Sequence, residues 1–350
     1  MKSYKVVEFG KPLQRVEEPN PSPKGTEVLV RITAAGVCHS DVHLWEGFFD
    51  MGGGNKYSTA KTMNPPRTMG HEIVGEVVAL GPDAKGAKVG DKAVVYPWIG
   101  CGKCWYCEHG TENLCPTPHA LGVNDDGGYA DHVLVPHAKY LYSYGALPVE
   151  LACLYACSGI TAFGAIKKAK GHDGGKPILV IGAGGVGLMG VRFAKAVLGR
   201  EPIVADIDEN KRKLALANGA CAAVDPREKE ARKQVMDLTG GTGVAAAVDF
   251  VGNEASTQFG WRALGRGGRL VVVGLFGGTF STPLPMFAFT GNQIMGSVTG
   301  TPDEMKEMMD LVTAGKAEPV PIIKRKLDEA DATLQELRKG LIMGRAVLVP

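Results

Sequence analysis

Four cysteines are close enough in the sequence to hold one metal ion. Cys101, Cys104, Cys107 and Cys115 follow the spacing C-x2-C-x2-C-x7-C, which can close a tetrahedral shell around zinc. Disulfides are the alternative, and they rarely persist inside cells. A zinc module that binds nucleic acid is disfavoured because this segment carries two glutamates against one lysine. Since four thiolates leave no open position, we expect a structural zinc lobe over about residues 98–116.

A glycine-rich turn at the middle of the chain could hold a dinucleotide. Gly182, Gly184 and Gly187 have the spacing G-x-G-x-x-G, and they follow the apolar run 177–181, with Gly185 and Val186 completing the turn. A turn without a ligand can have the same local sequence, so the context decides. A helical pattern over 186–198 and a second strand over 202–205 follow, and that strand ends at Asp206. An acid at this point accepts hydrogen bonds from the adenosine ribose, so the order of elements favours a dinucleotide site.

The remaining cysteines and histidines suggest a second, open metal site. Cys38, His71 and Cys157 are far apart in the sequence, and each alone is equally consistent with a buried thiol or a core histidine. A nicotinamide accepts hydride from carbon, which requires the alcohol oxygen to lose its proton. Zinc with two thiolates, one imidazole and an open position supplies that acidity.

The elements that position these residues can be read from periodicity. Residues 1–35 and 73–78 alternate like half-buried strands, 127–141 is strand-like, and 48–66 reads as a flexible glycine-rich loop. Residues 147–156 read as a helix that places Cys153 and Cys157 on one face. From residue 177 to about 274, strands and helices alternate at the spacing of βαβ units, which predicts an α/β protein with a doubly wound parallel sheet.

Length and composition limit the classes of function. The chain has 350 residues, enough for about two domains, and is 45% hydrophobic and 22% charged with a net charge of +2. This balance gives no electrostatic reason to expect nucleic acid as a partner. The N-terminus lacks the apolar segment of a signal peptide and no apolar run reaches the length of a membrane span, so we expect a cytoplasmic protein with no membrane partner.

Over nearly its whole length the sequence resembles the zinc-dependent alcohol dehydrogenases of the medium-chain dehydrogenase/reductase superfamily. It is most similar to the bacterial and archaeal tetrameric type. The motifs that carry the resemblance are residues 36–43 (GVCHSDVH), 70–72 (GHE), the four-cysteine segment, 157–161 (CSGIT), the glycine turn and Gly344-Arg345.

The resemblance implies a role for each residue of the open metal site. Cys38, His71 and Cys157 would hold the catalytic zinc, and Glu72 would lie behind the metal. Asp41 would orient the ring of His71.

The resemblance also implies a proton path and cofactor contacts. Ser40 would take the alcohol proton and pass it through the nicotinamide ribose towards His43. His39, Arg345 and the glycine turn would face the pyrophosphate, while Asp206 and Lys211 would bind the adenosine ribose.

Two further positions are assigned by resemblance alone. Phe49 and Trp98 resemble pocket walls, which suggests an apolar slot for medium-chain or aromatic alcohols. Trp98 is also consistent with a core residue of the zinc lobe. No ligand role is implied for Cys153, which we expect in the core.

The implied architecture is a mostly β, GroES-like catalytic domain of residues 1–157 and 300–350 and a Rossmann NAD-binding domain of residues 158–299. The implied function is reversible hydride transfer between an alcohol and NAD, with two zinc ions per chain and a homotetrameric assembly. The alternatives are a polyol dehydrogenase, a zinc-free enone or quinone reductase on the same scaffold, and a non-catalytic dinucleotide sensor.

Overall fold

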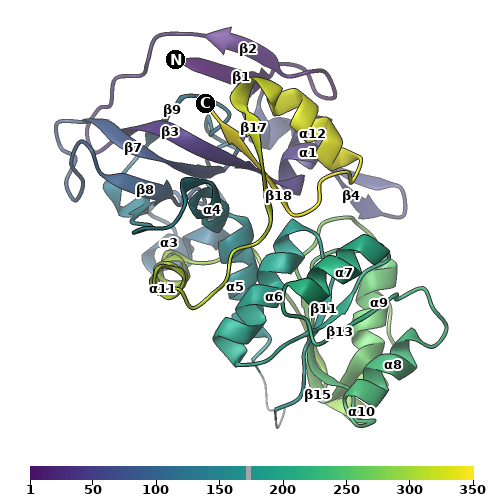
Figure 1. Ribbon diagram of the computed structural model, residues 1–350. Coiled ribbons are helices and arrows are strands. Elements are labelled where there is room, and N and C mark those ends of the chain that lie inside the picture. The colour runs from purple at the N-terminus through teal and green to yellow at the C-terminus, as the bar shows by residue number, and fades with distance from the viewer. Residues whose placement is uncertain (171–174) are drawn as a thin grey trace.

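The computed structural model describes residues 1–170 and 175–350, which form two halves joined by helices (Figure 1). The N-terminal strands and the C-terminal strands lie together in the upper half, and the middle of the chain forms the lower half. The chain therefore leaves the upper half, builds the lower half and returns.

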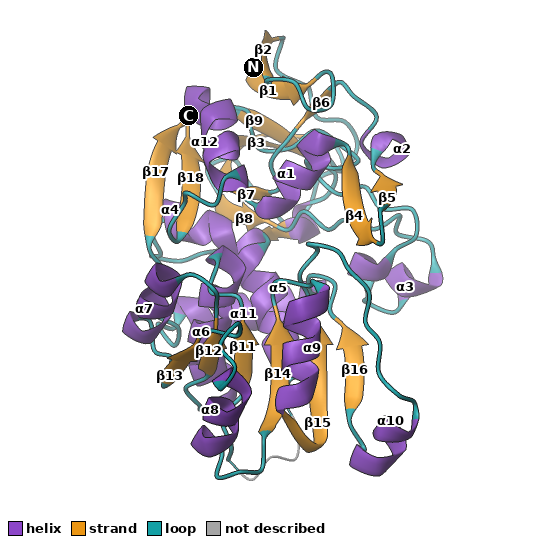
Figure 2. Cartoon of the chain, turned by 90° about the vertical axis from the view of Figure 1, so that its right-hand side faces the viewer, coloured by secondary structure: helices purple, strands orange, loops and turns teal. Residues whose placement is uncertain are grey.

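The lower half contains six parallel strands, consistent with the predicted doubly wound sheet. When the strands are numbered 1 to 6 in sequence order, they lie side by side in the order 3-2-1-4-5-6. Sheets with this order bind dinucleotides at the carboxyl ends of their strands. In sequence order the strands are β11 (Leu179–Ile181), β12 (Ile203–Ala205), β13 (Ala222–Val224), β14 (Val244–Asp249), β15 (Leu264–Val272) and β16 (Gln293–Gly296). Apolar residues fill β11 and β12 because helices cover both faces (Figure 2).

The lower half has six helices among the described residues, and those between β11 and β15 follow the alternation that the sequence predicts. They are α5 (Ser158–Lys168), α6 (Gly185–Leu198), α7 (Glu209–Ala217), α8 (Ala231–Leu238), α9 (Glu254–Ala263) and α10 (Pro285–Thr290). Helix α5 is almost wholly buried and packs against α6.

The upper half is mostly β. Its larger sheet has the order β10-β8-β7-β3-β18-β17, with β9 also paired to β3, and a smaller sheet has the order β2-β1-β6. The strands are β1 (Lys2–Val6), β2 (Gln14–Glu17), β3 (Val28–Val37), β6 (Arg67–Thr68), β7 (Glu72–Leu80), β8 (Lys92–Val95), β9 (His132–Val135), β10 (Leu141–Tyr142), β17 (Ile322–Lys326) and β18 (Arg345–Val349). The pairing of β18 with β3 places Ala346 opposite Val37, which brings the end of the chain to the Cys38 motif.

The helices of the upper half and of its connections are short, apart from three that exceed two turns. They are α1 (His39–Glu46), α2 (Ala60–Met63), α3 (Trp105–Glu108), α4 (Val149–Ala152), α11 (Pro302–Thr313) and α12 (Ala330–Arg338), with 3-10 turns η1 (Glu112–Leu114), η2 (Ala138–Tyr140), η3 (Cys153–Ala156) and η4 (Leu327–Glu329). In residues 1–170 and 175–350, no single helix is long and apolar enough to cross a membrane. The helical segments Val149–Ala156 and Ser158–Lys168 reach the length and apolar composition of a membrane span only when they are taken together, and they are bent by 54° at their junction.

The prediction of a flexible loop over residues 48–66 is wrong. The segment contains a hairpin of β4 (Phe48–Gly52) and β5 (Asn55–Ser58), followed by α2. Gly52 and its two following glycines have positive φ angles, so they form the turn of the hairpin. A Cβ at Gly52 would lie 2.6 Å from the Cα of Gly278, so this turn touches the lower half.

Two other segments also differ from the predicted elements. Residues 127–141 form the four-residue strand β9, the turn η2 and the first residue of β10 rather than a continuous strand. Residues 147–156 divide into α4 and η3, because the 3-10 turn begins at Cys153. The expectation that Cys153 and Cys157 share one face of an α-helix is therefore wrong.

Candidate active site

Three residues from separate elements converge on one buried point. Cys38 is the N-cap of α1, His71 precedes β7, and Cys157 is the N-cap of α5. Their ligand atoms all lie within 4.8 Å of one another, and the two sulfurs are 3.9 Å apart. A tetrahedral zinc ion bound at 2.3 Å holds two sulfurs about 3.8 Å apart. Because His71 Nε2 is also buried without a hydrogen-bond partner, this donor set fits zinc.

The register of two strands explains how Cys38 and His71 meet. Strands β3 and β7 are antiparallel, with Gly36 opposite Glu72, so the residues just beyond each pairing lie at the same end of the sheet. Turn η3 packs against both strands and delivers Cys157. Gly36 is required here because a Cβ would overlap the Glu72 carboxylate.

A buried carboxylate orients the histidine. Asp41 Oδ1 lies 3.1 Å from His71 Nδ1, and Asp41 Oδ2 accepts hydrogen bonds of 2.9 Å from the Cys38 backbone and from the Tyr129 hydroxyl. Burial opposes a positive charge on His71, but the Asp41 carboxylate outweighs it and raises the pKa of His71. With Nδ1 directed to Asp41, Nε2 is left to bind a metal.

Glu72 and Arg345 connect this donor set to the glycine turn. The buried Glu72 carboxylate accepts a 2.9 Å hydrogen bond from Ser158 N and forms an ion pair with Arg345. Burial raises the pKa of Glu72, and Arg345 opposes this effect. The aliphatic part of Arg345 covers Gly185, where a Cβ would overlap it, and Arg345 Nε is buried without a partner.

The glycine turn has the geometry that a pyrophosphate needs. Gly182 has a φ of 86°, and a Cβ at Gly187 would overlap the Gly182 carbonyl, so Gly187 lets α6 approach β11. A Cβ at Gly184 would meet no atom within 4 Å, so this side of the turn is open. Helix α6 begins at Gly185 and Val186, and its N–H groups together with Arg345 Nε could hold an anion.

Asp206 and Lys211 lie at the neighbouring strand end. Asp206 accepts hydrogen bonds from Ala183 N (2.7 Å) and Asp208 N (2.8 Å), one at each carboxylate oxygen. Each oxygen retains a lone pair for a ribose hydroxyl. Lys211 is half-buried in the first turn of α7 and donates its backbone N–H to Asp208.

Helix α1 carries Ser40, His39 and His43. The His39 ring lies 5.3 Å from the His43 ring and 4.8 Å from the Phe276 ring of the lower half. Burial lowers the pKa of both histidines. Within the described residues, no hydrogen bond joins Ser40 to His43, so a relay between them needs a bridging group.

Phe49 and Trp98 each lie beside a histidine of this region. The Phe49 ring, on β4, lies 5.0 Å from the ring of His43. The half-buried Trp98 ring lies 5.2 Å from the ring of His71, and its Nε1 donates a 3.2 Å hydrogen bond to the Ala156 carbonyl. Trp98 therefore borders His71, one of the candidate metal ligands.

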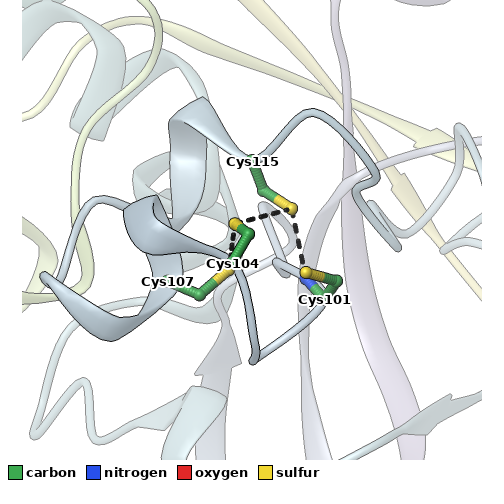
Figure 3. A group of neighbouring side chains, drawn as sticks. All are labelled: Cys101, Cys104, Cys107 and Cys115. Carbon is green, nitrogen blue, oxygen red and sulfur yellow. Dashed lines mark hydrogen bonds between the residues drawn. The ribbon is translucent and has the colours of Figure 1, made fainter.

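The second group of cysteines lies in the lobe around α3. The ligand atoms of Cys101, Cys104, Cys107 and Cys115 lie within 4.8 Å of one another, with Cys104 3.5 Å from Cys107 and 3.7 Å from Cys115. Figure 3 shows the four sulfurs turned towards one another. The Lys103 backbone N–H lowers the pKa of Cys101 to about 6, which favours the thiolate that binds zinc. All four ligands fit one closed zinc shell.

The sequence reasoning missed three residues of this region. Tyr129 holds Asp41, and the glycine pair before it was the available signal. Phe276 contacts His39, but no local pattern indicates it. Asp225 directly follows β13, the same position that identified Asp206 after its own strand.

Comparisons with known proteins find related families and structures. Residues 24–144 match the family described as the alcohol dehydrogenase GroES-like domain, and residues 185–314 match the zinc-binding dehydrogenase family. The chain is 38% identical, over the full length of both proteins, to the NAD-dependent alcohol dehydrogenase of Sulfurisphaera tokodaii. Its fold is similar to the crystal structure of the alcohol dehydrogenase of Aeropyrum pernix (34% identity, TM-score 0.88, all of both chains) and to that of the D-arabinose dehydrogenase of Sulfolobus solfataricus (29%, 0.84, 100% of this chain and 99% of that one).

Proposed function

We propose a reaction and a site for this chain from the premise that it belongs to the zinc-dependent alcohol dehydrogenases of the medium-chain dehydrogenase/reductase superfamily. The reaction is reversible, NAD-linked oxidation of an alcohol to an aldehyde or ketone. The observation that carries it is the 3.9 Å separation of the Cys38 and Cys157 sulfurs beside the unpartnered Nε2 of His71. A zinc-free reductase has no need of this donor set.

When bound, zinc would supply Lewis acidity and NAD would accept the hydride. The chain's own residues position and deprotonate the alcohol. Asp41 fixes the His71 ring, and Arg345 with the N-terminus of α6 holds the pyrophosphate. Ser40 would accept the hydroxyl proton while its own hydroxyl proton moves on, through a bridging group, towards His43, which would release a proton to solvent.

Two structural assignments belong to the same proposal. Residues 1–157 and 300–350 form the catalytic domain, and residues 158–299 form the NAD-binding domain. This division is supported by the pairing of β18 with β3 and by the confinement of the parallel strands to residues 179–296. The closed four-cysteine shell is the structural zinc site, and the three-ligand set is the catalytic one.

Assembly and compartment are also proposals. A homotetramer is supported by the edge strand β16, which pairs only with β15 among the described strands. This strand and nearby residues expose apolar side chains that another copy of the chain could cover. These are Leu284, Phe289, Ile294, Met295 and Val298. A cytoplasmic location is supported by the eight cysteines, none of which forms a disulfide.

The test of the reaction is a panel of primary, secondary and benzylic alcohols and polyols assayed by NADH absorbance. Zinc-dependent reduction of NAD by the monohydric alcohols is the expected result. Activity on polyols alone would favour a polyol dehydrogenase. Nucleotide binding without turnover of any alcohol, aldehyde or ketone would favour a sensor.

Substrate size is expected to depend on Trp98. Large aromatic walls give apolar substrates area to bury at roughly 25 cal/mol per Å2, so medium-chain and benzylic alcohols should have higher kcat/KM than ethanol, and polyols should react poorly. We expect Trp98→Ala to raise the KM of benzylic alcohols roughly tenfold, equivalent to about 1.4 kcal/mol, and to admit bulkier secondary alcohols. Steady-state kinetics across the panel measures both effects.

The control for Trp98 is Trp105→Ala, which removes an exposed indole from the zinc lobe. This change should leave the order of substrates unaltered, and both variants should keep two zinc ions per chain. If Trp98→Ala lowered thermal stability without changing the order of substrates, Trp98 would be a structural residue of the lobe.

NAD is expected to be preferred over NADP because the Asp206 carboxylate repels a 2′-phosphate. Ile207 and Asp208 follow it in the sequence, so no arginine directly after Asp206 neutralises that phosphate. Asp206→Gly should reduce the free-energy difference that favours NAD over NADP by on the order of 1 to 3 kcal/mol, which is the size of a lost charged hydrogen bond. The measurement is the ratio of kcat/KM for the two cofactors, and equal values in the wild-type protein would contradict this assignment.

A further inference from the structure

A second buried carboxylate lies beside Asp206 at the carboxyl edge of the parallel sheet. Asp206 follows β12 and Asp225 follows β13, and these strands pair with Ala205 opposite Val224. The Asp206 N–H donates a 3.2 Å hydrogen bond to the Val224 carbonyl. Asp206 is 9% exposed and Asp225 8%. The two acids therefore occupy adjacent positions at the edge where a dinucleotide binds.

Asp225 binds two arginines. Arg227 forms a two-point contact with it, from Nε to Oδ1 at 2.9 Å and from Nη2 to Oδ2 at 2.6 Å. Arg212, on α7, donates from Nη1 to Asp225 Oδ2 at 3.2 Å. A two-point contact of this kind fixes both the charge and the orientation of a guanidinium.

The same arginines hold the turn that follows Asp206. Arg212 Nη1 donates a 2.7 Å hydrogen bond to the Asp206 carbonyl, and Arg227 Nη2 donates a 2.8 Å hydrogen bond to the Ile207 carbonyl. Two positive groups thus lie within one residue of the acid proposed to bind the ribose. The side chain of Arg227 is 66% exposed, so a ligand can reach it.

An arginine near the end of the second strand is the feature that accommodates the 2′-phosphate of NADP, because guanidinium and phosphate match in charge and geometry. In this chain the arginines are present, but Arg212 Nη1 and Arg227 Nε and Nη2 are directed to a carboxylate and to main-chain carbonyls. Two carboxylates and two guanidiniums also cancel in charge at this edge.

We propose that Asp225 is a second determinant of the NAD preference, because it neutralises Arg212 and Arg227 and keeps both on the turn after Asp206. It acts on specificity through these arginines, whereas Asp206 acts on the ribose directly. The inference rests on the proposed function, since it assumes that the dinucleotide lies at this edge.

The test is a set of dissociation constants for NADH and NADPH, measured by the fluorescence of the bound nucleotide in the zinc-loaded protein. We expect Asp225→Asn to lower the ratio of the NADPH constant to the NADH constant about threefold or more, because it frees Arg227. In the double variant Asp206→Gly/Asp225→Asn, the ratio of the NADPH to the NADH dissociation constant should be about tenfold lower than the value obtained by multiplying the changes in the two single variants. The reason is that the freed arginine then meets the phosphate without a neighbouring carboxylate.

Asp237→Asn is the matched control. It removes one negative charge near the C-terminus of α8, where Asp237 pairs only with Lys233 among the described residues, at the opposite edge of the sheet. A general effect of net charge would alter the ratio in this variant as well. The proposed effect leaves it unchanged.

Arg227→Gln identifies the group that responds. Added to the Asp206→Gly/Asp225→Asn protein, it should abolish the gain in NADPH affinity. Added to Asp206→Gly, where Asp225 still holds Arg227, it should change the NADPH dissociation constant less than about threefold. A larger effect in Asp206→Gly would overturn the inference, even if the Asp225 variants did not fold. Additive single effects would also overturn it. Wild-type protein that bound neither nucleotide would overturn the proposed function and this inference with it, whereas the other failures concern the inference alone.

Discussion

Ser40→Ala is expected to lower kcat/KM for alcohol oxidation by a factor of roughly 100 or more, because it removes the group that takes the hydroxyl proton. Ser40 is the second residue of α1 and, in the described part of the chain, its side chain makes no hydrogen bond that the fold needs. Alanine favours helices, so the backbone should be preserved. The measurement is the initial rate of NADH formation with a benzylic alcohol.

The controls separate proton transfer from structure. Ser40→Thr keeps a hydroxyl and should retain much of the activity, whereas zinc content and the NADH dissociation constant should be unchanged in both variants. A Ser40→Ala protein within threefold of the wild type would show that another base takes the proton.

His43 gives the same path a pH dependence. Burial lowers the pKa of His43 below its usual value of about 6.5, so the ring is neutral, and able to accept a proton, at neutral pH. Its contribution to oxidation is therefore present above the lowered pKa and is lost as the pH falls through it. His43→Gln should cost less than Ser40→Ala and mostly on the acid side, because water replaces the outermost relay group at higher pH. Equal effects of the two changes at every pH would contradict the ordered path.

The sequence indicates the glycine turn of the proposed dinucleotide site directly because that turn is local. Gly182, Gly184 and Gly187 lie within six positions, and the requirement for Gly187 follows from the direct contact of α6 with the turn. The strand ends that carry Asp206 and Asp225 are likewise set by the strand–helix alternation. What the sequence could not supply is the pairing of the two arginines with Asp225, which depends on side-chain directions.

The open metal site shows the opposite case. Cys38, His71 and Cys157 could each be named as candidates, but their meeting depends on the register of β3 with β7 and on η3, which are non-local. The hairpin over β4 and β5 was missed for a related reason. Three successive glycines, Gly52 to Gly54, were interpreted as a flexible loop, although their positive φ angles form a tight turn and Gly52 packs against Gly278 across the two halves.

The four-cysteine lobe should depend on its metal more than any other part of the chain. Segment 98–116 has only the short helix α3 and the turn η1, and its Trp105 and Leu114 are exposed, so it has little apolar core of its own. The buried Glu112 ties it to the turn η2 through Tyr140 (2.6 Å) and Lys139 (2.8 Å). In such a segment, the free energy of zinc binding largely becomes folding free energy.

Cys104→Ser should therefore destabilise the protein by at least about 3 kcal/mol and lower Tm by roughly 5 to 10 °C. Elemental analysis should find about two zinc ions per wild-type chain and one in the variant, and the remaining ion should be the one that chelators remove first, because its site is open. Calorimetry and metal analysis on the same samples make the measurement.

Two other cysteine variants make this prediction specific. Cys221→Ser changes an exposed thiol outside both metal groups and should leave zinc content and Tm unaltered. Cys157→Ser should remove the other zinc ion and the activity, with a smaller loss of stability because α5 and η3 remain packed in the core. Trp98 lies three residues before Cys101, so Cys104→Ser should also raise the KM of benzylic alcohols. A stable, fully active Cys104→Ser protein with one zinc ion would show that the lobe holds its shape without metal.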